Sequence, residues 1–211
     1  MKKIFRRPLI FAVMLSFAAA LTACSVENTS VTHSIAEAKT DYYDTEEALF
    51  NASPVVVLAE KTETEENVSK GLYGNRFYMG YTLSDLTVKA VIKNTASHEL
   101  AAGDMIKLVE NQFTFKSPAG YVISHTNYYT KTSPGSSYIL YLDYLAGEDT
   151  YSIVTGFQGK LPVSDEEPIL FSPGENEKTD TKFNYDEYDR YTAALEGIRE
   201  DALKRLAENG L

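Results

Sequence analysis

Apolar and polar residues alternate along much of the chain with a period of two, which is typical of β-strands. Residues 137–145 are nearly apolar on both faces, so we expect them to form the most buried strand. The alternation continues beyond residue 147, and we expect Ser152, Gln158 and Lys160 to lie on the face exposed to solvent. Further strands are predicted at 54–61, 81–93, 105–109, 113–115 and 121–124, with a loop at 62–71.

The strand at 81–93 contains a change of parity. Leu86 shares its parity with the apolar residues that follow it, whereas Tyr81 and Leu83 have the other parity. A β-bulge near Ser84 or Asp85 would bring both sets onto the core face.

Two segments have helical patterns. At 41–53, Asp44 or Thr45 stands at the N-cap position, with acidic residues in the first turn. At 183–211, Asn184 can cap a longer helix, and Glu187 stands where a capping box requires it. The apolar stripe of this helix is narrow, so docking along one side of the sheet structure would cover it, and a partner helix is the alternative. The stripe consists of Tyr188, Tyr191, Leu195, Ile198, Ala202 and Leu206.

Strands dominate this pattern and most connections are short. We therefore predict a mostly β (α+β) fold, in which a small antiparallel β-barrel carries a short N-terminal helix and a C-terminal amphipathic helix.

The first 23 residues have the order of a secretory signal. Basic residues come first, at Lys2, Lys3, Arg6 and Arg7, and about a dozen apolar residues follow. A helix that crosses a membrane needs roughly 20 such residues, so a permanent span is not expected.

The signal ends in Leu21, Thr22 and Ala23, which form a tetrapeptide with the residue that follows them, Cys24. Cys24 is the only cysteine of the chain. This tetrapeptide resembles the lipobox of bacterial lipoproteins. The resemblance implies that the thiol of Cys24 receives a diacylglyceryl group, and that the chain is cut before it. A hydroxyl cannot replace the thiolate in this chemistry. The alternative is an ordinary secretory signal with an incidental cysteine.

The resemblance also implies a location. Two or three acyl chains, such as palmitate, anchor a protein stably. Lipidation of Cys24 would hold the chain on the extracytoplasmic face of the cell membrane, or at an outer membrane if the organism has one.

The charge argues against a nucleic-acid partner. The chain has 20 Lys and Arg against 30 Asp and Glu, and removal of the signal, with four of the bases and no acid, leaves a net charge of −14. Binding to phosphates requires clustered basic residues. Anionic headgroups would repel such a chain, so acyl chains rather than a basic patch would hold it at a membrane.

These observations predict a five-part organisation. One folded domain follows a polar segment that we expect to be a flexible tether. The parts are a lipoprotein signal peptide at 1–23, a lipid-anchored tether at 24–40, an OB-like barrel domain at 41–167, a linker at 168–182 and an amphipathic helix at 183–211.

Residues 53–163 resemble small uncharacterised lipoproteins of Firmicutes-type bacteria, and their order is similar to the OB-fold barrel of netrin-like modules. The segments that carry the resemblance include Ser-Pro-Val-Val-Val at 53–57, Gly-Asp-Met-Ile-Lys-Leu at 103–108 and Tyr-Ile-Leu-Tyr-Leu at 138–142. In netrin-like metalloproteinase inhibitors a free N-terminal cysteine chelates zinc. Cys24 is expected to be lipidated and precedes the first of these strands by some thirty residues, so that mechanism is not carried over.

Residues that could carry chemistry form no recognisable motif. His33, His98 and His125 lie far apart and have no metal-ligand spacing, so we expect exposed positions in the tether or in loops. The acid clusters at 63–66 and 165–167 do not match a calcium-binding EF-hand loop and are expected to be solvated. Neither a phosphate-binding loop nor a nucleophile elbow is present in the sequence.

Two further predictions concern single residues. Asp143 is the one acid in the apolar strand at 137–145, where burial would raise its pKa, and it is either a catalytic carboxylate or a strand-end residue. OB-like barrels bind ligands on an open face and its loops, which would place Tyr128, Tyr129 and Lys131 near a ligand.

The sequence therefore predicts a membrane-anchored extracytoplasmic lipoprotein that serves as a binding or adaptor module of the cell envelope. Its partner would be an envelope protein or a cell-wall ligand. We expect no enzymatic activity, cofactor or metal. Two alternatives remain open: an envelope-associated hydrolase, which would need a carboxylate pair, and a structural lipoprotein that oligomerises through its C-terminal helix.

Overall fold

A computed structural model describes residues 30–73, 76–117, 119–174, 177–179 and 183–211, with the backbone alone for 70–73 and 76–78. The predicted signal and Cys24 lie outside these residues. The elements are β1 (Val31–Ala36), α2 (Glu46–Ala52), β2 (Val55–Tyr73), β3 (Arg76–Asn94), β4 (Met105–Glu110), β5 (Gln112–Ser117), β6 (Gly120–Thr126), β7 (Ser137–Leu145), β8 (Thr150–Ile153), β9 (Lys160–Pro162), β10 (Lys178–Thr179) and α3 (Tyr185–Glu208).

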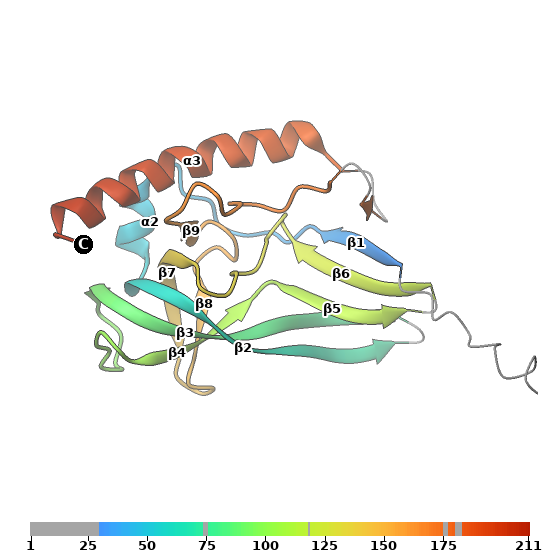
Figure 1. The fold of residues 1–211 in the computed structure, drawn as a ribbon, viewed down its shortest axis with the longest axis horizontal. Helices are drawn as coiled ribbons and strands as arrows, with labels where there is room; N and C mark the ends of the chain where they lie inside the picture. Colours follow the sequence, from blue (N-terminus) through green and yellow to red (C-terminus); the bar gives the residue numbers. More distant parts are fainter. Residues whose placement is uncertain (1–29, 74–75, 118, 175–176, 180–182) are drawn as a thin grey trace, which may run out of the picture.

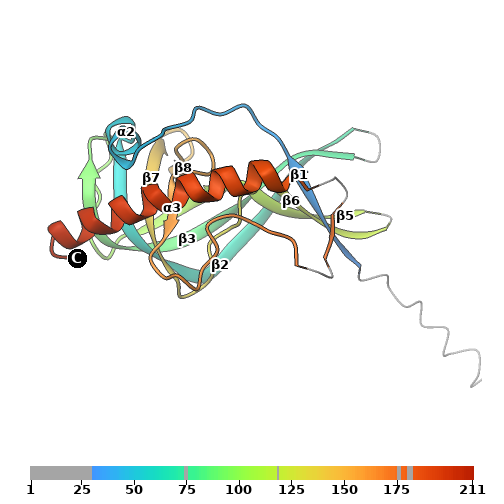
Figure 2. The ribbon, with the colours of Figure 1, turned by 90° about the horizontal axis from the view of Figure 1, so that it is seen from above.

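The strands form two sheets, and helix α3 lies across one side of the molecule (Figures 1 and 2). One sheet has four strands in the order β10–β1–β6–β5, and the other has six in the order β2–β3–β4–β8–β7–β9. The described part of the chain is therefore mostly β with two helices, one of them C-terminal. This confirms the predicted class at this level.

Strand β2 takes part in two ladders of the six-stranded sheet. It pairs with β3 through most of its length, and its first six residues, Val55–Glu60, also pair with β7. β4 pairs with β3 on one side and runs parallel to β8 at Leu108 and Val109 on the other. β7 pairs in turn with β8 and β9.

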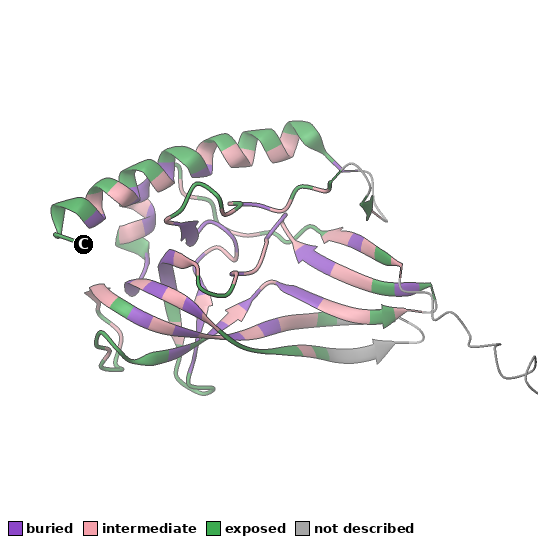
Figure 3. Cartoon of the chain, in the orientation of Figure 1, coloured by how far each residue is buried: buried purple, intermediate pink, exposed green. Residues whose placement is uncertain are grey.

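The core lies between these strands and α3. Strand β7 has the predicted bounds, and its residues from Tyr138 to Leu142 are buried, which confirms that it is a central strand. Figure 3 shows that buried and exposed positions alternate along other strands. On α3, the buried positions lie on the inner side and the exposed positions on the outer side.

Both predicted helices are confirmed. The Thr45 side chain caps α2 by accepting a hydrogen bond from the N–H of Ala48. The Asn184 side chain caps α3 by accepting one from the N–H of Glu187, 3.3 Å away. Because these side chains satisfy N–H groups in the first turn, the sequence pattern located the N-terminal end of each helix.

Helix α3 docks on the sheet structure, as expected. Four residues of the predicted stripe, Leu195, Ile198, Ala202 and Leu206, are buried in the core. Near its C-terminal end, the Arg205 guanidinium donates two hydrogen bonds, of 2.8 and 2.6 Å, to the buried Glu46 carboxylate of α2. This bidentate pair joins the two helices.

The prediction of a flexible tether is wrong for its last part. Residues 31–36 form β1, which pairs in parallel with β6 along its whole length and with β10 at Thr32 and His33. These partners come from much later in the chain, so the local polar pattern did not reveal the strand.

The prediction of a linker at 168–182 is also wrong for its described residues. Leu170 is buried and forms a β-bridge with Tyr129, and the N–H of Phe171 donates to the carbonyl oxygen of Tyr128 over 2.7 Å. Lys178 and Thr179 form β10. The segment is therefore tied to the fold at Leu170 and Phe171 and again at β10, whereas Pro168, Ser172 and Gly174 are exposed.

The loop predicted at 62–71 belongs to the long β2–β3 hairpin. Glu63, Glu65 and Glu66 are exposed there, so polar residues on this part of the hairpin meet solvent rather than a core. The predicted parity change in β3 is wrong as well. Thr82 and Ser84 are buried in regular alternation with Tyr81 and Leu83. The β2–β3 pairing does shift register opposite Asp85, where we expected a bulge, but the extra residues are in β2, between Lys61 and Glu65. Two further shifts lie between Val56 and Val57 and between Leu58 and Ala59.

Candidate functional site

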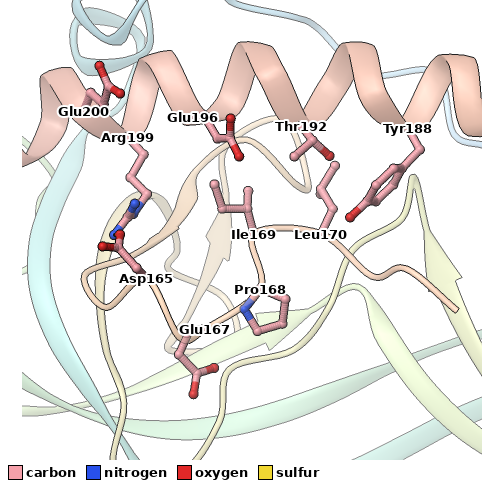
Figure 4. A pocket seen from close by; sticks show the side chains of 10 residues that line it. All are labelled: Asp165, Glu167, Pro168, Ile169, Leu170, Tyr188, Thr192, Glu196, Arg199 and Glu200. Atoms are coloured by element: carbon pink, nitrogen blue, oxygen red, sulfur yellow. The ribbon is translucent and has the colours of Figure 1, made fainter. Parts of the chain in front are cut away.

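A groove of roughly 390 Å³ separates α3 from the segment that follows β9 (Figure 4). One wall is a face of α3, because residues four apart in a helix lie on the same side. Tyr188, Thr192 and Glu196 project from that wall towards the opposite segment. The floor consists of Pro168, Ile169 and Leu170.

One end of the groove is closed by an ion pair. An Arg199 nitrogen lies 2.6 Å from a carboxylate oxygen of Asp165. The same guanidinium donates hydrogen bonds to the carbonyl oxygens of Pro162 and Val163, at 2.6 and 2.9 Å. These contacts hold α3 at the end of β9, so we assign Arg199 a role in the stability of the fold.

The remaining charges of the groove are negative. Glu167, Glu196 and Glu200 line it, and in the described structure Glu196 has neither an ion-pair nor a hydrogen-bond partner. The hydroxyl oxygen of Thr192 is buried without a hydrogen-bond partner among the described atoms. The groove therefore combines an apolar floor with one carboxylate, that of Glu196, that remains able to pair with a cation.

Glu167 is fixed in position by three hydroxyl groups. Ser133, Ser136 and Tyr138 donate hydrogen bonds of 2.8, 2.7 and 3.0 Å to its carboxylate. Desolvation acts to raise the pKa of Glu167, but these hydrogen bonds and the charge of Lys160 outweigh it, so the pKa is lowered. Glu167 is an anion held rigidly below the floor of the groove, with its carboxylate turned away from α3 (Figure 4).

Behind Glu167 lies a buried lysine. The Lys160 side chain is 1% exposed, and its ammonium nitrogen lies 5.2 and 5.3 Å from the ring centroids of Tyr129 and Tyr138. This nitrogen forms no hydrogen bond with any described atom. Burial lowers the pKa of Lys160 to about 8, and the charges of Glu110 and Glu167 offset part of that effect. Strand periodicity had predicted a solvent-facing Lys160, and that prediction is wrong.

A second buried carboxylate, Glu110, stands on the other side of this lysine. It accepts hydrogen bonds from the hydroxyl of Tyr129 at 2.7 Å, from the N–H and hydroxyl of Thr132 at 2.7 and 2.9 Å, and from the hydroxyl of Ser84. Burial also raises the pKa of Tyr129, so this phenol keeps its proton and remains a donor. Glu110 and its three hydroxyl partners are all buried, so this part of the cluster is closed to solvent.

The structure brings together two histidines that we expected to be separate and exposed. His33 on β1 and His125 on β6 are buried, with 2.9 Å between Nδ1 of His33 and Nε2 of His125. Both rings stack on Phe171. The parallel pairing of β1 with β6 produces this contact, and nothing in the sequence spacing indicated it.

The protonation of this pair follows from its partners. Nδ1 of His125 lies 2.8 Å from the carbonyl oxygen of Tyr129, which only accepts, so Nδ1 carries a proton. Desolvation lowers the pKa of His125 to about 4, so the ring is neutral and its Nε2 accepts a hydrogen bond from Nδ1 of His33. The pair therefore serves to link β1 to β6.

The other predicted site residues are dispersed. His98 is exposed, as expected, and stacks on Tyr144. Asp143 is exposed on β7, and desolvation raises its pKa. Tyr128 and Tyr129 are buried, so the prediction that they face a ligand is wrong.

The acidic clusters have structural partners. Lys131, which we placed near a ligand, pairs with Glu65, and Lys61 lies 3.7 Å from the same carboxylate. In the second cluster, Asp165 and Glu167 are engaged as described above. Among the described residues, no group of three or more His, Cys, Asp and Glu side chains is arranged to hold a metal ion.

Comparison of the chain with protein-family models, curated proteins and solved structures gives no match. Within the described part of the chain, neither helix has the length and apolar character needed to cross a membrane.

Proposed function

We propose that this protein is a lipid-anchored binding module on the extracytoplasmic face of a bacterial membrane. The observation that carries the proposal is the single cysteine, Cys24, placed after Leu21, Thr22 and Ala23 at the end of a signal-like segment. The anchor would leave a compact domain close to the bilayer.

We further propose that five strands of the six-stranded sheet form an OB-like barrel. The pairings run from β2 to β3, β4, β8, β7 and back to β2. If these five strands are numbered 1 to 5 along the chain, leaving out the inserted β5–β6 hairpin, the order of pairing is 1–2–3–5–4–1. OB barrels have this strand order. The short β4–β8 ladder of two residue pairs fits the partly open character of that fold.

For the ligand, we propose a peptide or similar molecule that carries an ammonium group next to an apolar group. The apolar part would lie on Pro168 and Ile169, and the ammonium group would approach the carboxylate of Glu196. A low-dielectric floor strengthens such a pairing relative to one in open solvent. The negative net charge of the mature chain would also attract an ammonium group.

Titration with two capped dipeptides tests this binding function. We expect acetyl-Leu-Lys-amide to shift the NMR signals of Thr192, Glu196 and Ile169, and acetyl-Leu-Glu-amide to leave them unchanged. Glu196→Gln should weaken binding of the lysine peptide by roughly fivefold, about 1 kcal/mol. Glu208→Gln, on the exposed last turn of α3, is the matched control and should leave the affinity unchanged. Equal binding of the two peptides, or shifts located away from the groove, would contradict the proposal.

A further inference from the structure

The chain enters its described part at the tip of the β5–β6 hairpin. Ser30 is held there by two hydrogen bonds: the N–H of Tyr121 donates to its carbonyl oxygen over 2.9 Å, and its hydroxyl donates to the carbonyl oxygen of Ala119 over 2.7 Å. The place where the N-terminal segment meets the domain is therefore determined by specific contacts.

A row of three side chains crosses the sheet at this tip. Val31 on β1 is in register with Tyr121 on β6, and Tyr121 is in register with Lys116 on β5. Residues in register on neighbouring strands present their side chains on the same face. Val31 and Tyr121 are 43% and 40% exposed, and the Lys116 ammonium lies 5.8 Å from the Tyr121 ring centroid.

A second hairpin reaches the same end of the molecule. Figures 1 and 2 both show the far end of β2–β3, the tip of β5–β6 and the start of β1 at the same end of the molecule, whereas the C-terminus lies at the opposite end. Met79, near the end of this hairpin, is 70% exposed. Exposed apolar and aromatic side chains thus gather at the end where the N-terminal segment enters.

We propose that this end of the domain, defined by Val31, Met79, Lys116 and Tyr121, rests on the surface of the bilayer that holds the anchor. The inference rests on the proposed lipidation of Cys24. Ser30 follows Cys24 by six positions, and a fully extended chain advances at most about 3.6 Å per residue, so the two lie within about 22 Å of each other. The anchored end is thus always close to the lipid headgroups.

The chemistry of the row fits a bilayer interface. Tyrosine is amphipathic and concentrates where one end of a side chain is apolar and the other is wet. Lysine can lay its methylene groups along apolar surface while its ammonium stays in water or meets a lipid phosphate. Because the mature chain has a net charge of −14, the contact depends on these apolar and aromatic groups rather than on a basic field.

The chain has no tryptophan, so single tryptophan variants report on position without interference. The experiment uses lipidated Tyr121→Trp and lipidated Leu211→Trp in vesicles of phosphatidylcholine and phosphatidylglycerol, with and without dibrominated phosphatidylcholine. Leu211 is the exposed final residue at the opposite end and serves as the matched control. Brominated lipid should reduce the tryptophan emission of the Tyr121→Trp protein roughly twofold, since interfacial side chains lie about 5–10 Å deep. The emission of the Leu211→Trp protein should stay unchanged.

The outcomes separate this proposal from the anchor itself. If both variants float with vesicles and neither is quenched, the anchor is upheld and the contact of this end with the bilayer is refuted. Equal quenching of both variants would also refute it. If the emission of the Tyr121→Trp protein changes with the amount of protein per vesicle and not with bromine, the surface contacts a second copy of the chain, and the contact with the bilayer is refuted. If the protein does not float, the anchor has failed and the inference falls with it. The Tyr121→Trp protein must retain the wild-type melting temperature, and Met79→Trp provides an independent second reporter.

Discussion

Leu195→Asp is expected to lower the free energy of unfolding by about 3 to 5 kcal/mol. The Leu195 side chain is 0% exposed and lies where α3 contacts the core. A carboxylate at this position would be buried without a partner, and the apolar contacts of the leucine would be lost as well. Urea unfolding at pH 7, followed by circular dichroism, measures the change.

Ala193→Asp is the matched control, because it adds the same charge to an exposed position of α3. Its cost should stay below about 1 kcal/mol, the difference in helix propensity between alanine and aspartate. Similar unfolding curves for the two variants would mean that α3 does not stabilise the domain, and would favour a helix that waits for a partner.

Lys160→Met is expected to stabilise the domain at pH 7 by about 1 to 3 kcal/mol. Burial lowers the pKa of Lys160 from 10.5 to about 8 in the folded protein. Below pH 8 both the folded and the unfolded chain hold the proton, so the full cost of the buried charge is present. Methionine has similar length and no charge, so it removes this cost.

The pH dependence has a definite sign. Between pH 8 and about 10 the unfolded chain binds more protons at this lysine, so the wild-type free energy of unfolding should rise with pH. Above pH 10 the tyrosines act in the opposite direction, because burial raises the pKa of Tyr129, and of Tyr138 to about 12. Unfolding curves at pH 7, 8, 9 and 10 should show the rise for wild type and for Lys204→Met, an exposed control, but not for Lys160→Met. A Lys160→Met protein that is less stable and keeps the rise would contradict this account of the cluster.

The helices and central strands could be predicted because their determinants are local. Thr45 and Asn184 satisfy N–H groups within their own first turns, and the apolar run of β7 needs a buried position wherever it pairs. Strand β1 could not be predicted in this way. Its neighbours β6 and β10 lie some 90 and 145 residues further along the chain, and the segment around it, residues 25–40, is mostly small and polar.

The candidate site could be predicted only in fragments. The face of α3 that forms one wall follows from helical spacing, but the opposing floor belongs to a segment whose composition suggested a linker. Lys160 and Gln158 are buried although alternation assigns them to solvent. Long polar side chains can be buried when carboxylates or backbone groups face them, and those partners come from distant strands.

The anchor at Cys24 underlies both the proposed function and the proposed contact with the bilayer. Metabolic labelling of cells with an acyl-chain probe, comparing wild type with Cys24→Ser, tests it most directly. The account predicts that the wild-type protein is labelled and cleaved, and that the serine variant is unlabelled and accumulates as the precursor, since a hydroxyl cannot form the thioether. Labelling of the serine variant, or a wild-type protein without label, would contradict it.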